Sequence, residues 1–140
     1  MTFRTRLAAS AILLAVPLAG CGTATAGKEA HNDDQRIEAA VREFYGALSE
    51  QGPGVAVTKA CAADRAEWDA LPDTQKSAAE MGKLSIRIVA VEDIVITGDR
   101  ATTKMTGGLA LPGSEDKNTT ATEHLRKEEG AWKVCSADGK

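Results

Sequence analysis

The chain has 140 residues and a formal net charge of −3, with 43% apolar and only 4% aromatic residues. This length favours a single domain. The acidic charge balance and the five aromatic side chains argue against an electrostatic surface or a base-stacking platform for nucleic acid, so we expect no nucleic-acid partner.

The first twenty residues have the layout of a bacterial signal peptide. Arg4 and Arg6 form a short positive region, and an apolar stretch that contains Pro17 follows over residues 7–19. A permanent transmembrane helix needs about twenty apolar residues, so export followed by cleavage is the better interpretation. A single buried core helix is the alternative, which Pro17 and the basic start disfavour. We therefore expect residues 1–20 to be removed.

Leu18-Ala19-Gly20-Cys21 ends this apolar stretch and resembles the bacterial lipobox. That motif implies a diacylglycerol on Cys21, palmitate-type acyl chains, and a protein anchored on the outer, extracytoplasmic face of the cell membrane. An ordinary secretory signal with a chance cysteine is the alternative. Cleavage would remove two basic and no acidic residues, leaving 15 basic against 20 acidic side chains. The lipid would then have to supply the membrane contact.

The remaining cysteines, Cys61 and Cys135, form the smallest even set once Cys21 is set aside. An oxidising compartment favours their pairing. Such a bridge would close a loop of about 75 residues and stabilise the domain by about 4 kcal/mol in the chain-entropy model. Two separate buried thiols are the alternative. The histidines, His31 and His124, show no ligand spacing to either cysteine, so we expect neither a metal nor another cofactor.

The first half of the exported chain predicts helices. Residues 21–32 are expected to be the lipidated cysteine and a flexible tether, with the first helix starting near Asn32 or Asp33. Apolar side chains then recur at helical spacing: Ile37, Ala40, Val41, Phe44, Tyr45 and Leu48. Gly52-Pro53-Gly54 should end this helix. Shorter helices are expected over residues 55–64, with Val57, Ala60 and Cys61 pointing inward, and over residues 73–81, with Gly82 as the stop.

The second half predicts a sheet. Strands are expected over residues 84–96, 101–105, 119–127 and 131–135. Side-chain parity is unclear over residues 89–93, which suggests a bulge. Gly107-Gly108 and Leu111-Pro112-Gly113 are expected to interrupt the pattern, and residues 114–118 to form a polar hairpin loop. Helices followed by strands with short turns predict an α+β domain over residues 33–137, with the helices on an antiparallel meander.

Three segments together resemble the NTF2-like superfamily in its small, secreted actinobacterial form. They are the opening helix of residues 37–48, the short cysteine-bearing Thr58-Lys-Ala-Cys61, and the terminal Gly130-Ala-Trp-Lys-Val-Cys135. Secreted mycobacterial antigen-type domains and lipoproteins also look similar. The resemblance covers residues 33–136 and implies a strongly curved sheet of about four strands, which wraps the helices into a cone with a pocket at its open end.

Enzymes of this superfamily, such as ketosteroid isomerases and polyketide cyclases, imply a pocket that holds an acidic base opposite a tyrosine or acid. The candidates by residue type are Tyr45, Asp64, Glu123 and His124, but none lies in a motif that carries a role across, so no catalytic residue is assigned. Glu123 and His124 are consecutive in a strand and should face opposite sides, so that they cannot both line one pocket. Tyr45 is expected to be a partly buried core residue.

The expected pocket lies near Phe44, Tyr45, Trp68 and Trp132. Trp132 is expected in the core beside the disulfide, with a position in the pocket as the alternative. The leading functional hypothesis is a lipid-anchored, non-enzymatic binding or accessory domain for a small apolar ligand or an envelope protein. An enzyme of the isomerase or cyclase kind and a purely structural envelope lipoprotein are the alternatives.

Overall fold

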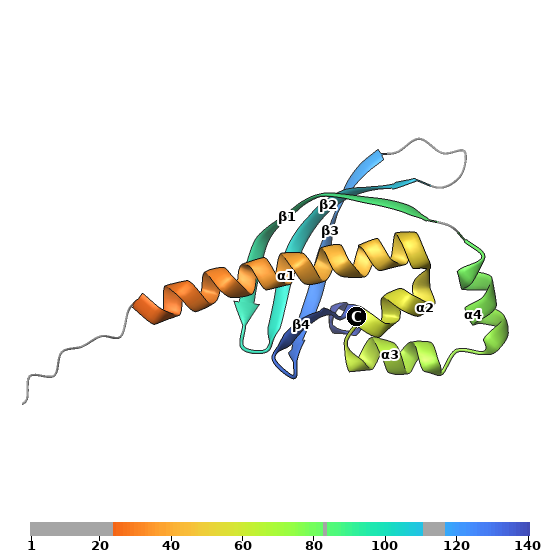
Figure 1. Ribbon diagram of the computed structural model, residues 1–140, viewed down its shortest axis with the longest axis horizontal. Helices are drawn as coiled ribbons and strands as arrows, with labels where there is room; N and C mark the ends of the chain where they lie inside the picture. The colour runs from red at the N-terminus through yellow and green to blue at the C-terminus, as the bar shows by residue number, and fades with distance from the viewer. Residues whose placement is uncertain (1–23, 83, 111–116) are drawn as a thin grey trace, which may run out of the picture.

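The computed structural model describes residues 24–82, 84–110 and 117–140 (Figure 1). The expected leader over residues 1–20, Cys21 and the Leu111-Pro112-Gly113 motif lie outside the described residues. Every described helix and strand lies within residues 24–140, so this segment contains the whole described fold.

A long helix, α1, crosses one face of a curved antiparallel sheet, and shorter helices follow it before the chain enters the sheet (Figure 1). The elements are α1 (Ala24–Gln51), α2 (Pro53–Ala56), η1 (Val57–Lys59), α3 (Ala62–Asp69), α4 (Asp73–Glu80), β1 (Ser85–Thr97), β2 (Arg100–Ala110), β3 (Lys117–Glu128), β4 (Ala131–Val134) and η2 (Ser136–Gly139). The strand order is β1-β2-β3-β4, with antiparallel neighbours throughout. The α+β class and the meander are therefore confirmed.

The first helix begins at Ala24 rather than near Asn32 or Asp33, and it overlaps the segment expected to be a tether. Alanine, lysine and glutamate, which favour helices, are frequent before Asn32. Asp33 does not cap the helix, because it lies inside α1 rather than at its start; its Oδ2 accepts a hydrogen bond of 3.0 Å from Lys127 Nζ on β3. The helix ends at Gln51, before Gly52 with φ of 93°, as the glycines predicted.

The prediction of one helix over residues 55–64 is wrong, because the chain becomes extended at Ala60 and Cys61. Ala60 forms a parallel bridge with Val134, and Cys61 N donates a hydrogen bond of 2.9 Å to Val134 O. Pairing with β4 holds these residues out of the helix, although both are buried as expected. Val57, by contrast, is only half-buried. The last short helix, α4, agrees with its prediction to within one residue.

The sheet shows both the expected irregularity and an unexpected continuity. Register shifts lie between Ile88 and Ala90 and between Glu92 and Val95, which confirms a bulged β1. Gly107 and Gly108, however, do not interrupt β2, since both pair with β1 and β3. A Cβ on Gly107 would collide with the carbonyl oxygen of Arg87, so glycine is what lets the two strands lie this close.

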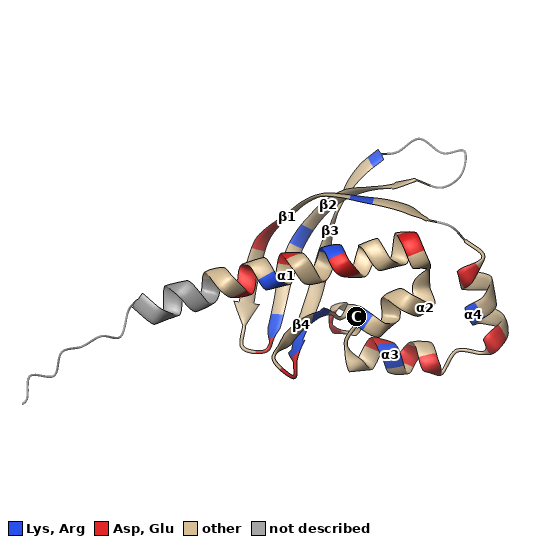
Figure 2. Ribbon diagram, in the orientation of Figure 1, with Lys and Arg blue, Asp and Glu red and all other residues tan. Residues whose placement is uncertain are grey.

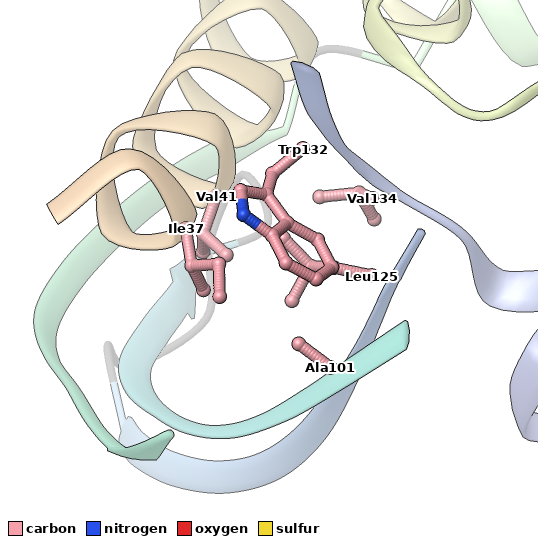
Figure 3. Close-up of a cluster of buried hydrophobic side chains, with 6 residues drawn as sticks. All are labelled: Ile37, Val41, Ala101, Leu125, Trp132 and Val134. Atoms are coloured by element: carbon pink, nitrogen blue, oxygen red, sulfur yellow. The ribbon is translucent and has the colours of Figure 1, made fainter. Parts of the chain in front are cut away.

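The buried core lies between the middle of α1 and the sheet (Figure 3). Its buried residues are Ile37, Val41, Ala101, Leu125, Trp132 and Val134. Figure 3 shows the Trp132 indole among the side chains of α1 and those of β3 and β4. Trp132 is only 5% exposed, which confirms its expected place in the core.

A disulfide joins Cys61 to Cys135, with a Cα–Cα distance of 5.1 Å and a sequence separation of 74. Both cysteines are fully buried. The bridge fastens the segment between η1 and α3 to the residue that follows β4, so it ties the helical half of the chain to the end of the sheet. The predicted pairing is confirmed.

Candidate functional site

A cavity with a mainly apolar lining lies between the C-terminal half of α1 and the first three strands, beyond the core. Its volume is about 290 Å³. The apolar part of its lining comprises Leu48, Leu84, Ile86, Ile88, Met105, Leu109 and Ala121, and the remaining lining residues are Tyr45, Arg87, Gly107, Gly108, Thr119 and Glu123. Pockets that hold small molecules have this character, with many apolar groups and few polar ones.

The cavity exists because little side chain covers this end of the sheet. Gly107 and Ala121 contribute at most a methyl group to the face of β2 and β3 that looks towards α1. The short β4 pairs with β3 only from Leu125 to Glu128, so it adds nothing beside this end. As a result Leu109 stays 48% exposed, and Met105 is only half-buried.

One end of the cavity is polar. Tyr45 Oη donates a hydrogen bond of 2.8 Å to Glu123 Oε1, and both side chains are half-buried. Burial raises the pKa of Glu123, although the hydrogen bond from Tyr45 and the charge of His124 act in the opposite direction. The pKa of Tyr45 is raised by burial first and then by the Glu123 charge. Tyr45 therefore keeps its proton at neutral pH and shares it with the carboxylate.

A second hollow, of about 270 Å³, lies on the other side of this pair, at the free edge of β3. Glu123 and His124 both line it, together with Tyr45, Thr122, Ser136, Gly139 and Lys140. The prediction that the two neighbours cannot share a pocket is therefore wrong for this hollow. The last hydrogen bond on this side of β3 in the described structure is the one of 2.7 Å from Cys135 N to His124 O, so β3 is an edge strand from here towards Lys117. At such an edge the side chains of both faces can reach the same space. Of these two neighbours, Glu123 also lines the apolar cavity and His124 does not.

Of the four residues expected near a pocket, the structure places only Tyr45 in the apolar cavity. Phe44 packs edge-on against Tyr45, with ring centroids 5.1 Å apart. Trp68 lies on α3 beside Gly54, and Trp132 lies in the core with Lys127 Nζ 5.4 Å from its ring. The cavity is lined by aliphatic residues instead. Alternation in β1 and β2 contains that signal, since Ile88 and Met105 point inward opposite Gly107 and Ala121, and Ile86 points inward opposite the half-exposed Leu109.

Asp64 has a structural role in this fold. Its carboxylate accepts hydrogen bonds of 2.7 Å and 2.9 Å from the backbone N–H groups of Ser136 and Ala137, which fixes the start of η2 against α3. In the described part of the chain, Asp64 also lies with Cys61 and Cys135 in a group whose ligand atoms are within 4.8 Å of one another. The disulfide takes up both sulfurs, so this group lacks the thiolates that a metal would need.

Charged side chains of both signs are interspersed along α1 and α3 (Figure 2).

The better-buried ion pairs involve Asp138 and Asp33. Asp138 accepts hydrogen bonds from Arg126, which hold its pKa below the usual range, and Arg100 Nη1 lies 3.5 Å from the same carboxylate. The pKa of Asp33 is lowered mainly by Lys127. The Trp132 N–H also contributes to this lowering, although it makes no hydrogen bond of ordinary geometry in the described structure.

No protein-family model matches the chain, and no curated protein matches its sequence. Membership of the NTF2-like superfamily therefore stays a prediction. Among the helices that the structure describes, none has the length and apolar character needed to span a bilayer.

Proposed function

We propose that this protein is a lipid-anchored envelope protein whose domain binds a small apolar ligand in the cavity between α1 and strands β1 to β3. The observation that carries the proposal is the cavity itself, with about 290 Å³ of space against aliphatic side chains that no other part of the described chain covers. Unfilled apolar surface of this kind is typical of a binding site. A ligand of about 15 non-hydrogen atoms would bind in the micromolar to millimolar range.

The proposed location is supported by the pattern of residues 1–21 and by the disulfide. The leader and the lipobox-like motif suggest export and a lipid on Cys21. The bridge between Cys61 and Cys135 supports an oxidising compartment. Two acyl chains would hold the domain stably at a membrane surface, where apolar ligands are concentrated.

The binding test uses residues 24–140 in oxidised form and the apolar fluorophore N-phenylnaphthylamine. We expect a saturable rise in fluorescence for the wild type. Met105→Trp, which fills the cavity, should weaken binding at least about tenfold. Val89→Trp is the matched control, because Val89 is exposed on β1 and does not line the cavity. Unsaturable binding by the wild type, or equal binding by Met105→Trp, would contradict the proposal.

The anchor has a separate test. The full-length chain, expressed in a bacterial host, should partition into the detergent phase after membrane extraction, and Cys21→Ser should move it to the aqueous phase. The same variant should lose incorporation of labelled palmitate. A wild type that takes up no label would remove the anchor from the proposal without affecting ligand binding.

A second candidate is an isomerase or cyclase type of enzyme, which the half-buried Glu123 favours, because a base in an apolar pocket with a raised pKa suits proton abstraction. Tyr45 donates its proton to Glu123 itself, so in this arrangement it does not offer that proton to a substrate carbonyl. The test is deuterium exchange beside the carbonyl of an apolar ketone, followed by NMR. An enzyme would lose this exchange in Glu123→Gln and keep it in Glu50→Gln, whereas no protein-dependent exchange would eliminate the candidate. A purely structural role is the remaining alternative.

A further inference from the structure

We infer that the apolar cavity takes an apolar alcohol, whose hydroxyl group donates a hydrogen bond to Glu123, and that it rejects the carboxylate of the same chain length. This inference rests on the proposed function and adds the chemical class of the ligand. It follows from which hydrogen-bonding atoms the polar end of the cavity leaves available.

Glu123 has one carboxylate oxygen to spare. Among the described residues its only hydrogen bond is the one from Tyr45 to Oε1, so Oε2 keeps its full capacity to accept. The Tyr45 oxygen can also accept one hydrogen bond while it donates to Glu123. A hydroxyl group is small and neutral, and it can donate its one proton to Oε2.

A carboxylate ligand meets the opposite situation. At this end it would bring a second negative charge beside a half-buried carboxylate, and two such groups in one site oppose each other's ionisation. Arg87 does not relieve this conflict. It alternates with the inward-facing Ile86 and Ile88, and its Nη2 donates a hydrogen bond of 2.9 Å to Asn118 Oδ1, across from Gly108 in the strand register. The alternation therefore directs its guanidinium to the other face of the sheet, so Arg87 contributes backbone rather than charge to the cavity lining.

An amine would also donate to Glu123, but it would carry a charge into the same half-buried place. Burying a charged pair costs more desolvation than burying a neutral hydroxyl group that forms the same hydrogen bond. The half-burial of Glu123, which raises its pKa, already disfavours charge in this place. The neutral donor is therefore the better complement.

The test is competition against bound N-phenylnaphthylamine by decanol, decanoate and decylamine at neutral pH, with residues 24–140. For the wild type we expect decanol to displace the fluorophore at a concentration about tenfold lower than decanoate or decylamine. In Glu123→Gln the preference over decanoate should fall to about threefold or less, because the neutral amide no longer repels the acid. Glu50→Gln, at an exposed position of α1, should keep the wild-type preference.

Equal competition by decanol and decanoate on the wild type would overturn the alcohol inference while leaving the apolar site intact. Stronger competition by decylamine would overturn it in favour of a cationic ligand. A fluorophore that does not bind at all contradicts the proposed function instead. The wild-type comparison decides the question even if Glu123→Gln does not fold.

Discussion

The two ends of the space between α1 and the sheet are built from the same kinds of element and differ in what fills them. At the closed end, Trp132 and Val134 from β4 complete the contact between the helix and β3, and the residues are almost fully buried. At the open end β4 is absent, Gly107 and Ala121 present no bulk, and a cavity of about 290 Å³ remains. An amphipathic helix on a sheet thus yields a core or a pocket according to the size of the side chains opposite it.

The largest expected effect removes the bridge that holds the closed end. Replacing Cys61 and Cys135 together by serine should lower the free energy of unfolding by about 4 kcal/mol, because the unfolded chain regains the freedom of a long loop. Urea denaturation under oxidising conditions measures this loss. Reduced wild type is the control and should show a similar loss. A thiol assay that finds two free cysteines in the oxidised protein would contradict the bridge.

A matched pair of leucines compares the two ends directly. Leu125→Ala should cost about 3 kcal/mol of stability, because Leu125 is fully buried at the closed end and its removal leaves a void. Leu109→Ala should cost about 0.5 kcal/mol or less, because that side chain is 48% exposed at the open end. Thermal or urea denaturation of both variants gives the two values. Equal losses would mean that the open end is packed as tightly as the core.

The strand glycine beside the cavity offers a further comparison. Gly107→Ala should destabilise the domain by about 2 kcal/mol, because the new Cβ collides with the Arg87 backbone and the strands must separate. Gly46→Ala is the control, since nothing lies within 4 Å of a Cβ there and alanine favours the helix by about 0.5 to 1 kcal/mol. Stabilisation by both substitutions would show that β1 and β2 do not approach so closely.

The smallest expected effect is a difference in pH dependence between the acids of the two ends. The pKa of Glu123 is raised by burial, so its ionisation destabilises the fold, and stability should fall as pH rises above 4.5 through its folded-state pKa. The pKa of Asp33 is lowered, mainly by Lys127, so its contribution should be present above pH 3.8 and be lost as pH falls through its folded-state pKa. Glu123→Gln and Asp33→Asn should remove these opposite slopes from stability curves measured by urea denaturation. Slopes of the same sign would contradict this account of the two carboxyl groups.

Much of the architecture follows from local patterns in the sequence. The helical spacing of Ile37, Val41 and Leu48 predicted α1, and the odd parity around residues 89–93 predicted the bulge of β1. The cysteine count predicted the disulfide. The helix and the bulge depend on the spacing of neighbouring residues, and the disulfide prediction depends on the number of cysteines. Neither requires knowledge of how the rest of the chain folds.

The candidate site, by contrast, is formed by contacts between distant segments, and local sequence patterns do not predict such contacts. Tyr45 and Glu123 are far apart in the chain, and their hydrogen bond arises only when α1 lies over β3. The aromatic residues suggested the pocket, yet Trp132 fills the core because β4 folds back beside β3. Gly107 suggested an interruption because glycine weakens isolated strands, whereas close approach by β1 makes it a requirement here.

A methyl-resolved NMR titration of residues 24–140 with decanol reports on both ends of this space in one sample, and so shows which end binds the ligand. We expect saturable shifts for the methyl groups of Ile86, Ile88 and Met105, which line the cavity, and unchanged signals for Ile37 and Leu125 in the core. Shifts that favour the core residues, or no saturable shifts at all, would contradict the assignment of the open end as a binding site.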